Sequence, residues 1–139
     1  MMSYTWAHRF YEIARTVATW SKDPDRKVGA VLVDNRKRIR GTGYNGLPCG
    51  LDYWGDKVRA DDHVHAEVNA ILNANGDVRG CALFTTTFPC TPCAAIIIQA
   101  GIQLVWAPPP EYGSSSWWHS QLHAKSMFKD AGVDVYNAK

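Results

Sequence analysis

Helical and strand patterns alternate along this chain of 139 residues, and the alternation limits the folds it can adopt. Apolar residues three and four apart mark a first helix through Trp6, Phe10 and Val17, with Ser3 suited to be its N-cap. The rest of the chain predicts strands at 28–33 and 39–44, a helix at 65–73, a strand at 81–87, a helix at 91–99, a strand at 103–107, a helix ending near 131–132 and a strand at 133–136. This order predicts an α/β fold with three layers (α-β-α), in which helices cover both faces of a central five-stranded mixed sheet.

Length and composition fit one domain that spans residues 1–139. Apolar residues make up 46% of the chain, which is enough for one core. No apolar run approaches the roughly 20 residues that a membrane span needs. The N-terminus lacks the basic segment and apolar stretch of a secretory signal. We therefore expect a cytoplasmic protein that has no membrane partner.

The charges are nearly balanced, with 15 basic and 13 acidic side chains and a net charge of +2. A polynucleotide-binding protein usually carries a clustered basic surface, so we expect no nucleic-acid partner. The basic cluster at residues 36–40 is best explained as a solvated turn between two strands.

Two short segments carry the candidate chemistry: His65-Ala66-Glu67 and Pro89-Cys90-Thr91-Pro92-Cys93. Each opens a predicted helix, where the helix N-terminus favours ionised thiolates. Cys90 and Cys93 are three residues apart and fall on one helix face, close enough to bind one ion. Together with His65 they make three zinc ligands and leave the fourth tetrahedral position to water, whose pKa zinc lowers to about 7.

Glu67 is better suited to proton transfer than to metal binding. It lies two residues beyond His65, roughly 200° around a regular helix. If His65 occupies a distorted first position, Glu67 can approach the metal-bound water from the side. We therefore expect Glu67 to be the general acid and base.

Two other kinds of site could use the same cysteines. A closed structural zinc site would need a fourth ligand, for which His63, Cys49 and His8 are the candidates. We expect the side chain of His63 to point away from that of His65 on an extended segment. A redox Cys-x-x-Cys motif would not account for the His-x-Glu segment, so a catalytic zinc site is favoured. Cys81, at the start of an apolar run, is expected to pack in the core.

The two motifs match the H-x-E and P-C-x-x-C signature of zinc deaminases. The longer strings resemble the deoxycytidylate (dCMP) deaminase branch of the cytidine deaminase superfamily. They are Ser21-Lys-Asp-Pro24, Val28-Gly-Ala30, Gly43-Tyr-Asn-Gly46-Leu-Pro, His65-Ala-Glu-Val-Asn-Ala-Ile71, Phe88-Pro-Cys-Thr-Pro-Cys-Ala94, Gln99-Ala-Gly-Ile102 and Ala131-Gly-Val133. The resemblance covers nearly the whole chain and implies a cytidine-deaminase-like fold.

The resemblance also implies a reaction, the hydrolysis of dCMP to dUMP and ammonia, which feeds thymidylate synthesis. Glu67 would take a proton from the activated water, deliver it to N3 of the base and then help to protonate the departing amine, while the water oxygen adds to C4. The backbone N–H of Ala66 would hold O2 of the base. Asn45 would bind the deoxyribose 3′-hydroxyl, although it could instead be an ordinary left-handed turn residue before Gly46. Phe88 could stack on the base or belong to the core.

The site for the 5′-phosphate is less defined by the sequence. Lys22 lies inside a matching string and is the favoured candidate, and Tyr112 follows the proline run as a second one. Arg26 and Lys27 lie on the same loop as Lys22, and a solvated surface charge explains them equally well.

Regulation and assembly are further implications of the resemblance. Related enzymes are commonly hexamers that dCTP activates and dTTP inhibits. The long loop at residues 45–62 would hold the effector, with Gly46, Gly50 and Asp52 near its triphosphate and Mg²⁺. Some relatives carry a second, structural zinc, but only Cys49 and His63 remain uncommitted here, so we expect one zinc per subunit.

Three alternatives stay open from the sequence. The chain could deaminate another cytosine nucleotide or a nucleoside. It could be a polynucleotide deaminase of the tRNA adenosine type, which shares the zinc motifs. Alternatively, it could be a binding module that zinc stabilises without catalysis.

Overall fold

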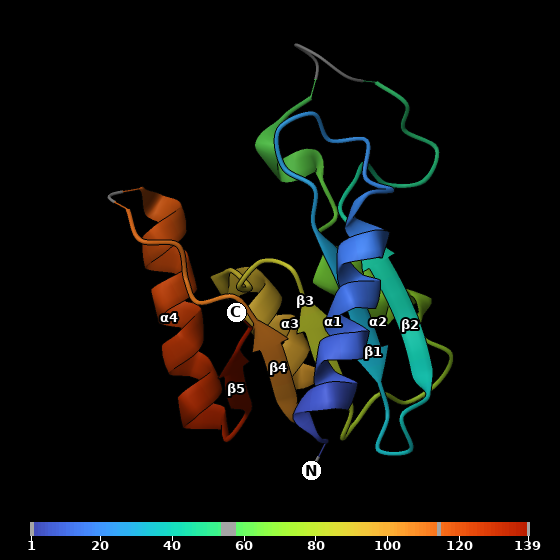
Figure 1. Cartoon of the computed structure of the whole chain (residues 1–139). Helices are drawn as coiled ribbons and strands as arrows, with labels where there is room; N and C mark the ends of the chain where they lie inside the picture. The colour runs from blue at the N-terminus through green and yellow to red at the C-terminus, as the bar shows by residue number, and fades with distance from the viewer. Residues whose placement is uncertain (1, 54–57, 114, 139) are drawn as a thin grey trace.

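The computed structural model describes residues 2–53, 58–113 and 115–138, and in these residues one mixed sheet forms the centre of the molecule (Figure 1). Its five strands lie in the order β2-β1-β3-β4-β5. β1 is antiparallel to β2 and β3, whereas β3, β4 and β5 run parallel. In chain order the elements are α1 (Tyr4–Ala18), β1 (Gly29–Val33), β2 (Ile39–Tyr44), the short 3₁₀ helix η2 (Ala60–Asp62), α2 (Ala66–Asn73), β3 (Ala82–Thr85), α3 (Thr91–Gln99), β4 (Leu104–Ala107), α4 (Ser116–Ala131) and β5 (Asp134–Asn137).

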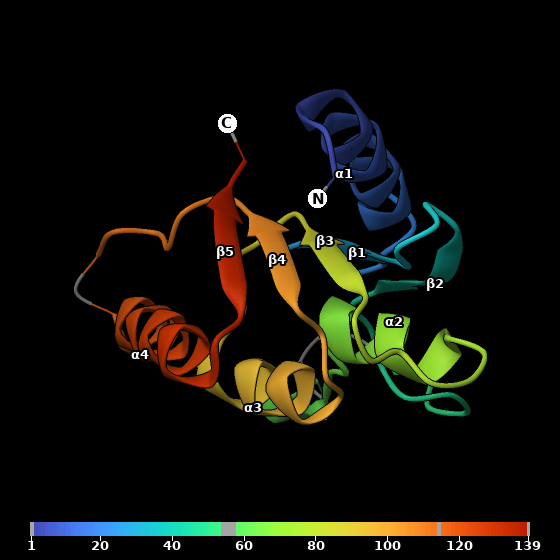
Figure 2. The same cartoon turned by 90° about the horizontal axis from the view of Figure 1, so that it is seen from below.

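Helices cover both faces of the sheet, α1 on one face and α2, α3 and α4 on the other (Figure 2). The central strand β1 shows how the sequence separates the two layers, because successive side chains of a strand point to opposite faces. Val31 and Val33 pack with Phe10 of α1, whereas Ala30 and Leu32 pack in the core under the other three helices. All five residues of β1 are therefore buried. The expected three-layer α/β fold is confirmed.

The helix ends follow the expected capping signals. The side chain of Ser3 accepts a hydrogen bond from the backbone N–H of Trp6 at 3.4 Å. α4 ends at Gly132, whose left-handed backbone suits glycine. The helix expected from His65 begins one residue later, with His65 as its N-cap. The strands expected at 28–33, 81–87, 103–107 and 133–136 are shortened or shifted by one or two residues at their ends.

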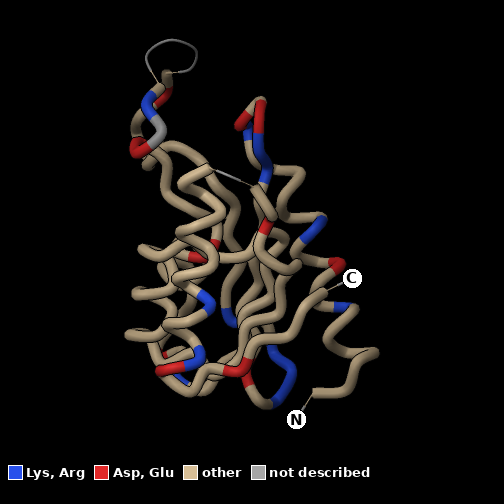
Figure 3. Tube along the Cα trace, turned by 90° about the vertical axis from the view of Figure 1, so that its left-hand side faces the viewer, with Lys and Arg blue, Asp and Glu red and all other residues tan. Residues whose placement is uncertain are grey.

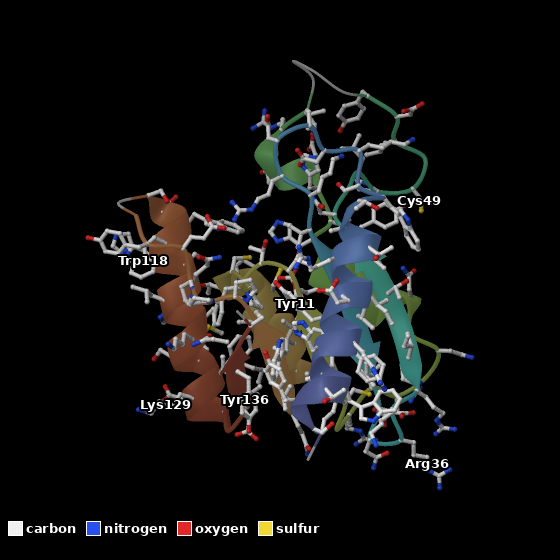
Figure 4. All side chains as sticks on the ribbon, viewed as in Figure 1. Tyr11, Arg36, Cys49, Trp118, Lys129 and Tyr136 are labelled. Atoms are coloured by element: carbon white, nitrogen blue, oxygen red, sulfur yellow. The ribbon has the colours of Figure 1, made fainter. Side chains whose placement is uncertain are left out.

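The basic cluster at residues 36–40 includes the exposed β1–β2 turn, as expected. One carboxylate oxygen of Asp34 accepts the backbone N–H groups of Arg36 and Arg38, at 2.9 and 3.0 Å, which holds the turn. Arg36 lies at the tip of this hairpin and points away from the body of the molecule (Figure 4). Among the described helices, none has the length and hydrophobicity to cross a bilayer.

Helix α2 lies directly on strand β2, and this contact sets the position of the candidate site. A Cβ atom at Gly43 of β2 would be 2.3 Å from the backbone nitrogen of Ala70 and 2.4 Å from the carbonyl oxygen of Ala66. Neither backbone atom can yield without moving the helix. Gly43 therefore allows α2, and with it Glu67, to approach the sheet.

We predict that Gly43→Ala lowers the free energy of unfolding by about 1–3 kcal/mol, because the methyl group overpacks the β2–α2 contact. Urea denaturation measures the change. Gly113→Ala is the control, since a Cβ atom at Gly113 meets nothing within 4 Å; its effect should stay within about 0.5 kcal/mol. An unchanged unfolding midpoint for Gly43→Ala would contradict the close contact.

Candidate metal centre and active site

The N-terminal ends of two neighbouring helices bring three possible metal ligands together. His65 is the N-cap of α2, Cys90 is the N-cap of α3, and Cys93 lies in the first turn of α3. Nδ1 of His65 is 3.1 Å from Sγ of Cys93 and 3.5 Å from Sγ of Cys90. The three ligand atoms all lie within 4.8 Å of one another, and in the part of the chain that the structure describes they form the one such group.

This group fits a zinc ion. Zinc binds sulfur at about 2.3 Å and imidazole nitrogen at about 2.0–2.1 Å, so a tetrahedral site places sulfur and nitrogen about 3.6 Å apart. The observed separations are close to this value. Two thiolates and an imidazole are zinc-preferring ligands, and three of them leave one position open to water.

The close contacts shift the pKa values of the two thiols in opposite directions. A hydrogen bond from the Cys93 thiol, followed by the contact with His65, lowers the pKa of Cys90 to about 4. The same bond to Cys90, together with burial, raises the pKa of Cys93. The hydrogen bond with Cys90 also raises the pKa of His65. The three polar side chains are close enough to shift one another's pKa values, and a metal bound among them would displace their protons.

Glu67 lies in the first turn of α2, close to this group but not part of it. Only 4% of the residue is exposed. Burial raises the pKa of its carboxyl group to about 7. A carboxyl group with a pKa near neutrality can both accept and return a proton, as a general acid and base must.

A cavity of about 490 Å³ opens over the three side chains His65, Ala66 and Glu67. Its size lies within the range of small-molecule sites. The other lining residues come from five parts of the chain: Asp23, Pro24, Asp25, Arg26 and Val28 from the α1–β1 loop, Asn45 after β2, Val58, Arg59 and His63 from the segment before α2, Thr87 and Phe88 after β3, and Trp117 from α4.

Comparison with known proteins gives the family. A model of the cytidine and deoxycytidylate deaminase zinc-binding region matches residues 4–107. The chain belongs to this family. An uncharacterised deaminase of Aliivibrio fischeri is 42% identical over 135 residues, covering 94% of this chain and 91% of that protein. The deoxycytidylate deaminase of Mus musculus is 39% identical over 139 residues, covering 92% of this chain and 76% of that protein.

A solved structure gives the same answer for the fold. The dCMP deaminase of the cyanophage S-TIM5, in complex with dCMP and dUMP, has a TM-score of 0.83 and 26% identity, and the match covers 99% of this chain and 100% of that one. The expected membership of the deaminase family and the expected cytidine-deaminase-like fold are confirmed. The His/Cys/Cys group thus lies within the zinc-binding region of a deaminase, with its three ligand atoms positioned for a metal.

In this deaminase, Asn45 holds the α1–β1 loop against the end of β2. Its Oδ1 accepts the backbone N–H of Val28 at 2.8 Å, and its Nδ2 donates to the carbonyl oxygen of Arg26 at 2.9 Å. Asn45 is not a left-handed turn residue, because Lys37 alone has a positive φ among the described non-glycine residues. Asn45 also lines the cavity, so binding of the 3′-hydroxyl stays a prediction for it.

Helix α4 fixes the segment that carries the first cysteine. Gln121, which is fully buried, donates through Nε2 to the carbonyl oxygen of Phe88 at 2.9 Å and accepts the backbone N–H of Glu111 at 2.8 Å. Ser120 accepts the backbone N–H of Thr91 through its hydroxyl at 2.9 Å. The segments on both sides of Cys90, a candidate zinc ligand, are therefore bonded to one turn of α4.

The expectation for the direction of His63 was wrong. His63 and His65 line the same cavity, because residues two apart on an extended segment point to the same side. His63 nevertheless stands outside the group of three ligand atoms. Its Nε2 lies 3.6 Å from a carboxylate oxygen of Asp23.

Other residues proposed from the sequence lie away from the cavity. Lys22 is exposed and does not line it. Tyr112 is 92% exposed, and its ring packs edge-on against that of Trp118. Trp118 lies at the start of α4 (Figure 4). Neither position supports contact with a substrate in the cavity, so both roles remain untested predictions.

The proposed effector residues lie on the loop that follows β2. Gly46 pairs with Val64 through two backbone hydrogen bonds of 3.1 and 2.8 Å. Gly50 and Asp52 are exposed, and Gly50 has a φ of +90°. Part of this expected loop, residues 54–57, lies outside the described residues.

Sequence reasoning missed several residues of the cavity wall, above all Asp23, Arg59 and Trp117. Asp23 belongs to the matching Ser-Lys-Asp-Pro string and could have been noticed there. Its Oδ1 accepts the backbone N–H groups of Asp25 and Arg26, at 2.8 and 3.1 Å. Trp117 carries no such local signal.

We predict that Cys93→Ser removes most of the zinc, because a serine hydroxyl is not ionised at neutral pH and leaves two ligands. Metal analysis of the dialysed protein measures the zinc-to-chain ratio. Cys49→Ser is the control, since Cys49 is exposed and stands outside the ligand group; it should keep one zinc per chain. Full zinc content in Cys93→Ser would exclude this residue as a ligand.

Proposed function

We propose that this chain hydrolyses dCMP to dUMP and ammonia. One observation carries the proposal: His65, which belongs to the His/Cys/Cys group, and the buried carboxyl group of Glu67 line the same cavity, which is large enough for one nucleotide. The names of its relatives indicate the substrate, since one is called a deoxycytidylate deaminase and a structural neighbour holds dCMP and dUMP.

His65, Cys90 and Cys93 would hold the zinc ion. When bound there, zinc lowers the pKa of a water molecule toward neutrality and so makes it a nucleophile. Glu67 takes the proton of this water and passes it to N3 of the base as the oxygen adds to C4. The C4–N4 bond then breaks, Glu67 helps to move a second proton to the amine, and ammonia leaves.

The start of α2 can orient the base. The first N–H groups of a helix have no acceptor within the helix, and Ala66 is the first helical residue. Its N–H would bind O2 of the base, which places C4 toward the metal ligands. Phe88 is only 1% exposed and its ring packs edge-on against Phe128, so it supports the floor of the cavity as a core residue and can offer the base a ring edge.

We predict that Glu67→Ala keeps one zinc per chain but lowers kcat by about 10²–10⁴-fold, because a positioned acid and base contributes this much. Ammonia release from dCMP and metal analysis measure the two quantities. If Glu67→Ala instead loses its zinc, Glu67 is a ligand and the proton-transfer role is wrong.

We also predict that dCMP is a far better substrate than a cytosine- or adenosine-containing oligonucleotide. Basic and acidic residues are interspersed along the described trace (Figure 3), and the near balance of 15 basic and 13 acidic side chains does not favour a polynucleotide partner. The measurement is ammonia release from dCMP, dCTP, cytidine and oligonucleotides by the zinc-loaded protein. Activity confined to oligonucleotides would refute the proposed function, and activity confined to dCTP or cytidine would change its substrate.

Regulation, assembly and location stay predictions. Activation by dCTP and inhibition by dTTP with Mg²⁺, at Gly46, Gly50 and Asp52, rest on the family resemblance, as does a hexameric assembly. A cytoplasmic location rests on the sequence. Steady-state assays with each effector and Mg²⁺ are the direct check on the regulatory part.

A further inference from the structure

Arg26 is a cation at the cavity wall that the proposed chemistry does not use. It lies on the loop between α1 and β1, and its Cζ is 5.0 Å from the ring centroid of Trp117 on α4. Its Nη2 pairs with the carboxylate of Glu111, which precedes α4. The α1–β1 loop and the segment that leads into α4, which are distant in sequence, thus meet at one guanidinium group.

We propose that Arg26 binds the 5′-phosphate of the substrate and thereby makes the enzyme select nucleotides over nucleosides. This inference rests on the proposed function, because it takes the base to lie at Ala66 and Glu67. It assigns the phosphate to Arg26 in place of Lys22, which is exposed and does not line the cavity.

The position of Trp117 connects the two ends of the proposed substrate. Its ring packs edge-on against that of His65, with the centroids 6.3 Å apart, and Arg26 lies over the same ring. A nucleotide whose base reaches the metal ligands can therefore extend along Trp117 toward the guanidinium group. Arginine suits this role, since its planar fork can bind two phosphate oxygens at once.

The backbone of Arg26 is fixed at both of its polar groups. Its N–H donates to Asp23 at 3.1 Å, and its carbonyl oxygen accepts from Asn45 at 2.9 Å. Glu111 is fixed as well, because its own backbone N–H donates to the buried Gln121. A cation that is held in place before binding loses less conformational entropy when the ligand arrives.

Neither Glu111 nor Asp23 blocks a phosphate. The side chains of Arg26 and Glu111 are 40% and 61% exposed, and ion pairs this open to water contribute little. The pair engages Nη2, so the guanidinium keeps further donors for a phosphate. Asp23 is committed to backbone N–H groups. Arg59 also lines the cavity, but its side chain is 79% exposed and is the weaker candidate.

The test compares the binding of dUMP and deoxyuridine, which differ only in the phosphate and are not turned over. Isothermal titration of the zinc-loaded protein measures both affinities. We expect the wild type to prefer dUMP. Arg26→Met should lower the affinity for dUMP by about 10–100-fold and leave that for deoxyuridine unchanged, because it removes charge-assisted hydrogen bonds to the phosphate and keeps an unbranched side chain against Trp117.

Lys22→Met is the matched control, since it removes one positive charge from the same loop and should keep the preference for dUMP. An equal loss for both ligands in Arg26→Met would mean a structural role and would overturn the inference. The inference would also be overturned if Lys22→Met or Arg59→Met lost the preference for dUMP while Arg26→Met kept it.

Binding and activity measurements on the same variants distinguish a failure of this inference from a failure of the proposed function. If the wild type prefers dUMP through Arg26 but releases no ammonia from dCMP, the proposed function fails and the phosphate site stands. If the wild type deaminates dCMP and Arg26→Met keeps the same kcat/KM for dCMP, the phosphate assignment fails alone.

Discussion

The candidate active site depends on two helix N-termini that meet at one point. α2 presents His65 from its N-cap, and α3 presents Cys90 from its N-cap and Cys93 from its first turn. Both helix ends favour negative charge and carry N–H groups that lack helical acceptors. The same geometry can therefore stabilise thiolates for a metal and leave the N–H of Ala66 for an oxygen of the base. The buried carboxyl group of Glu67 is tolerable there because it neighbours a site built for a cation.

Each of the two helices is held by an element that is remote in sequence. α2 rests on β2 because Gly43 has no side chain to separate them. α3 is held at its start by α4, through Ser120 and the buried Gln121. A buried amide is costly unless both of its ends are bonded, and both ends of Gln121 are. Because one end bonds the segment before Cys90 and the other bonds Glu111, α4 connects the loop that carries Cys90 to the residue that pairs with Arg26 of the cavity wall.

Local signals in the sequence were sufficient for the elements and for the zinc-binding group. Periodicity, the Ser3 cap and the two short motifs act within a few residues, and each depends little on the rest of the fold. The cavity wall is different, because it forms where distant loops meet. Lys22 and Arg26 are both cations on one loop. Asp23 accepts the backbone N–H of Arg26 and Asn45 donates to its carbonyl oxygen, and these bonds help to decide which of the two cations lines the cavity. The orientation of His63 was misjudged for a simpler reason, since its separation of two residues from His65 matches the period of an extended chain.

Asn45 lines the cavity, but this position alone does not mean that its side chain contacts the substrate. Its amide bonds Val28 and Arg26, and its carbonyl oxygen accepts the hydroxyl of Ser21 at 2.8 Å. Replacing Asn45 would release the loop that carries Arg26, whatever the side chain does with a sugar hydroxyl. A loss of activity on dCMP would then have two causes, one at the sugar and one at the phosphate. Only the loss at the sugar would persist with an unphosphorylated nucleoside, so the 3′-hydroxyl contact has to be judged on deoxycytidine against its 3′-deoxy analogue.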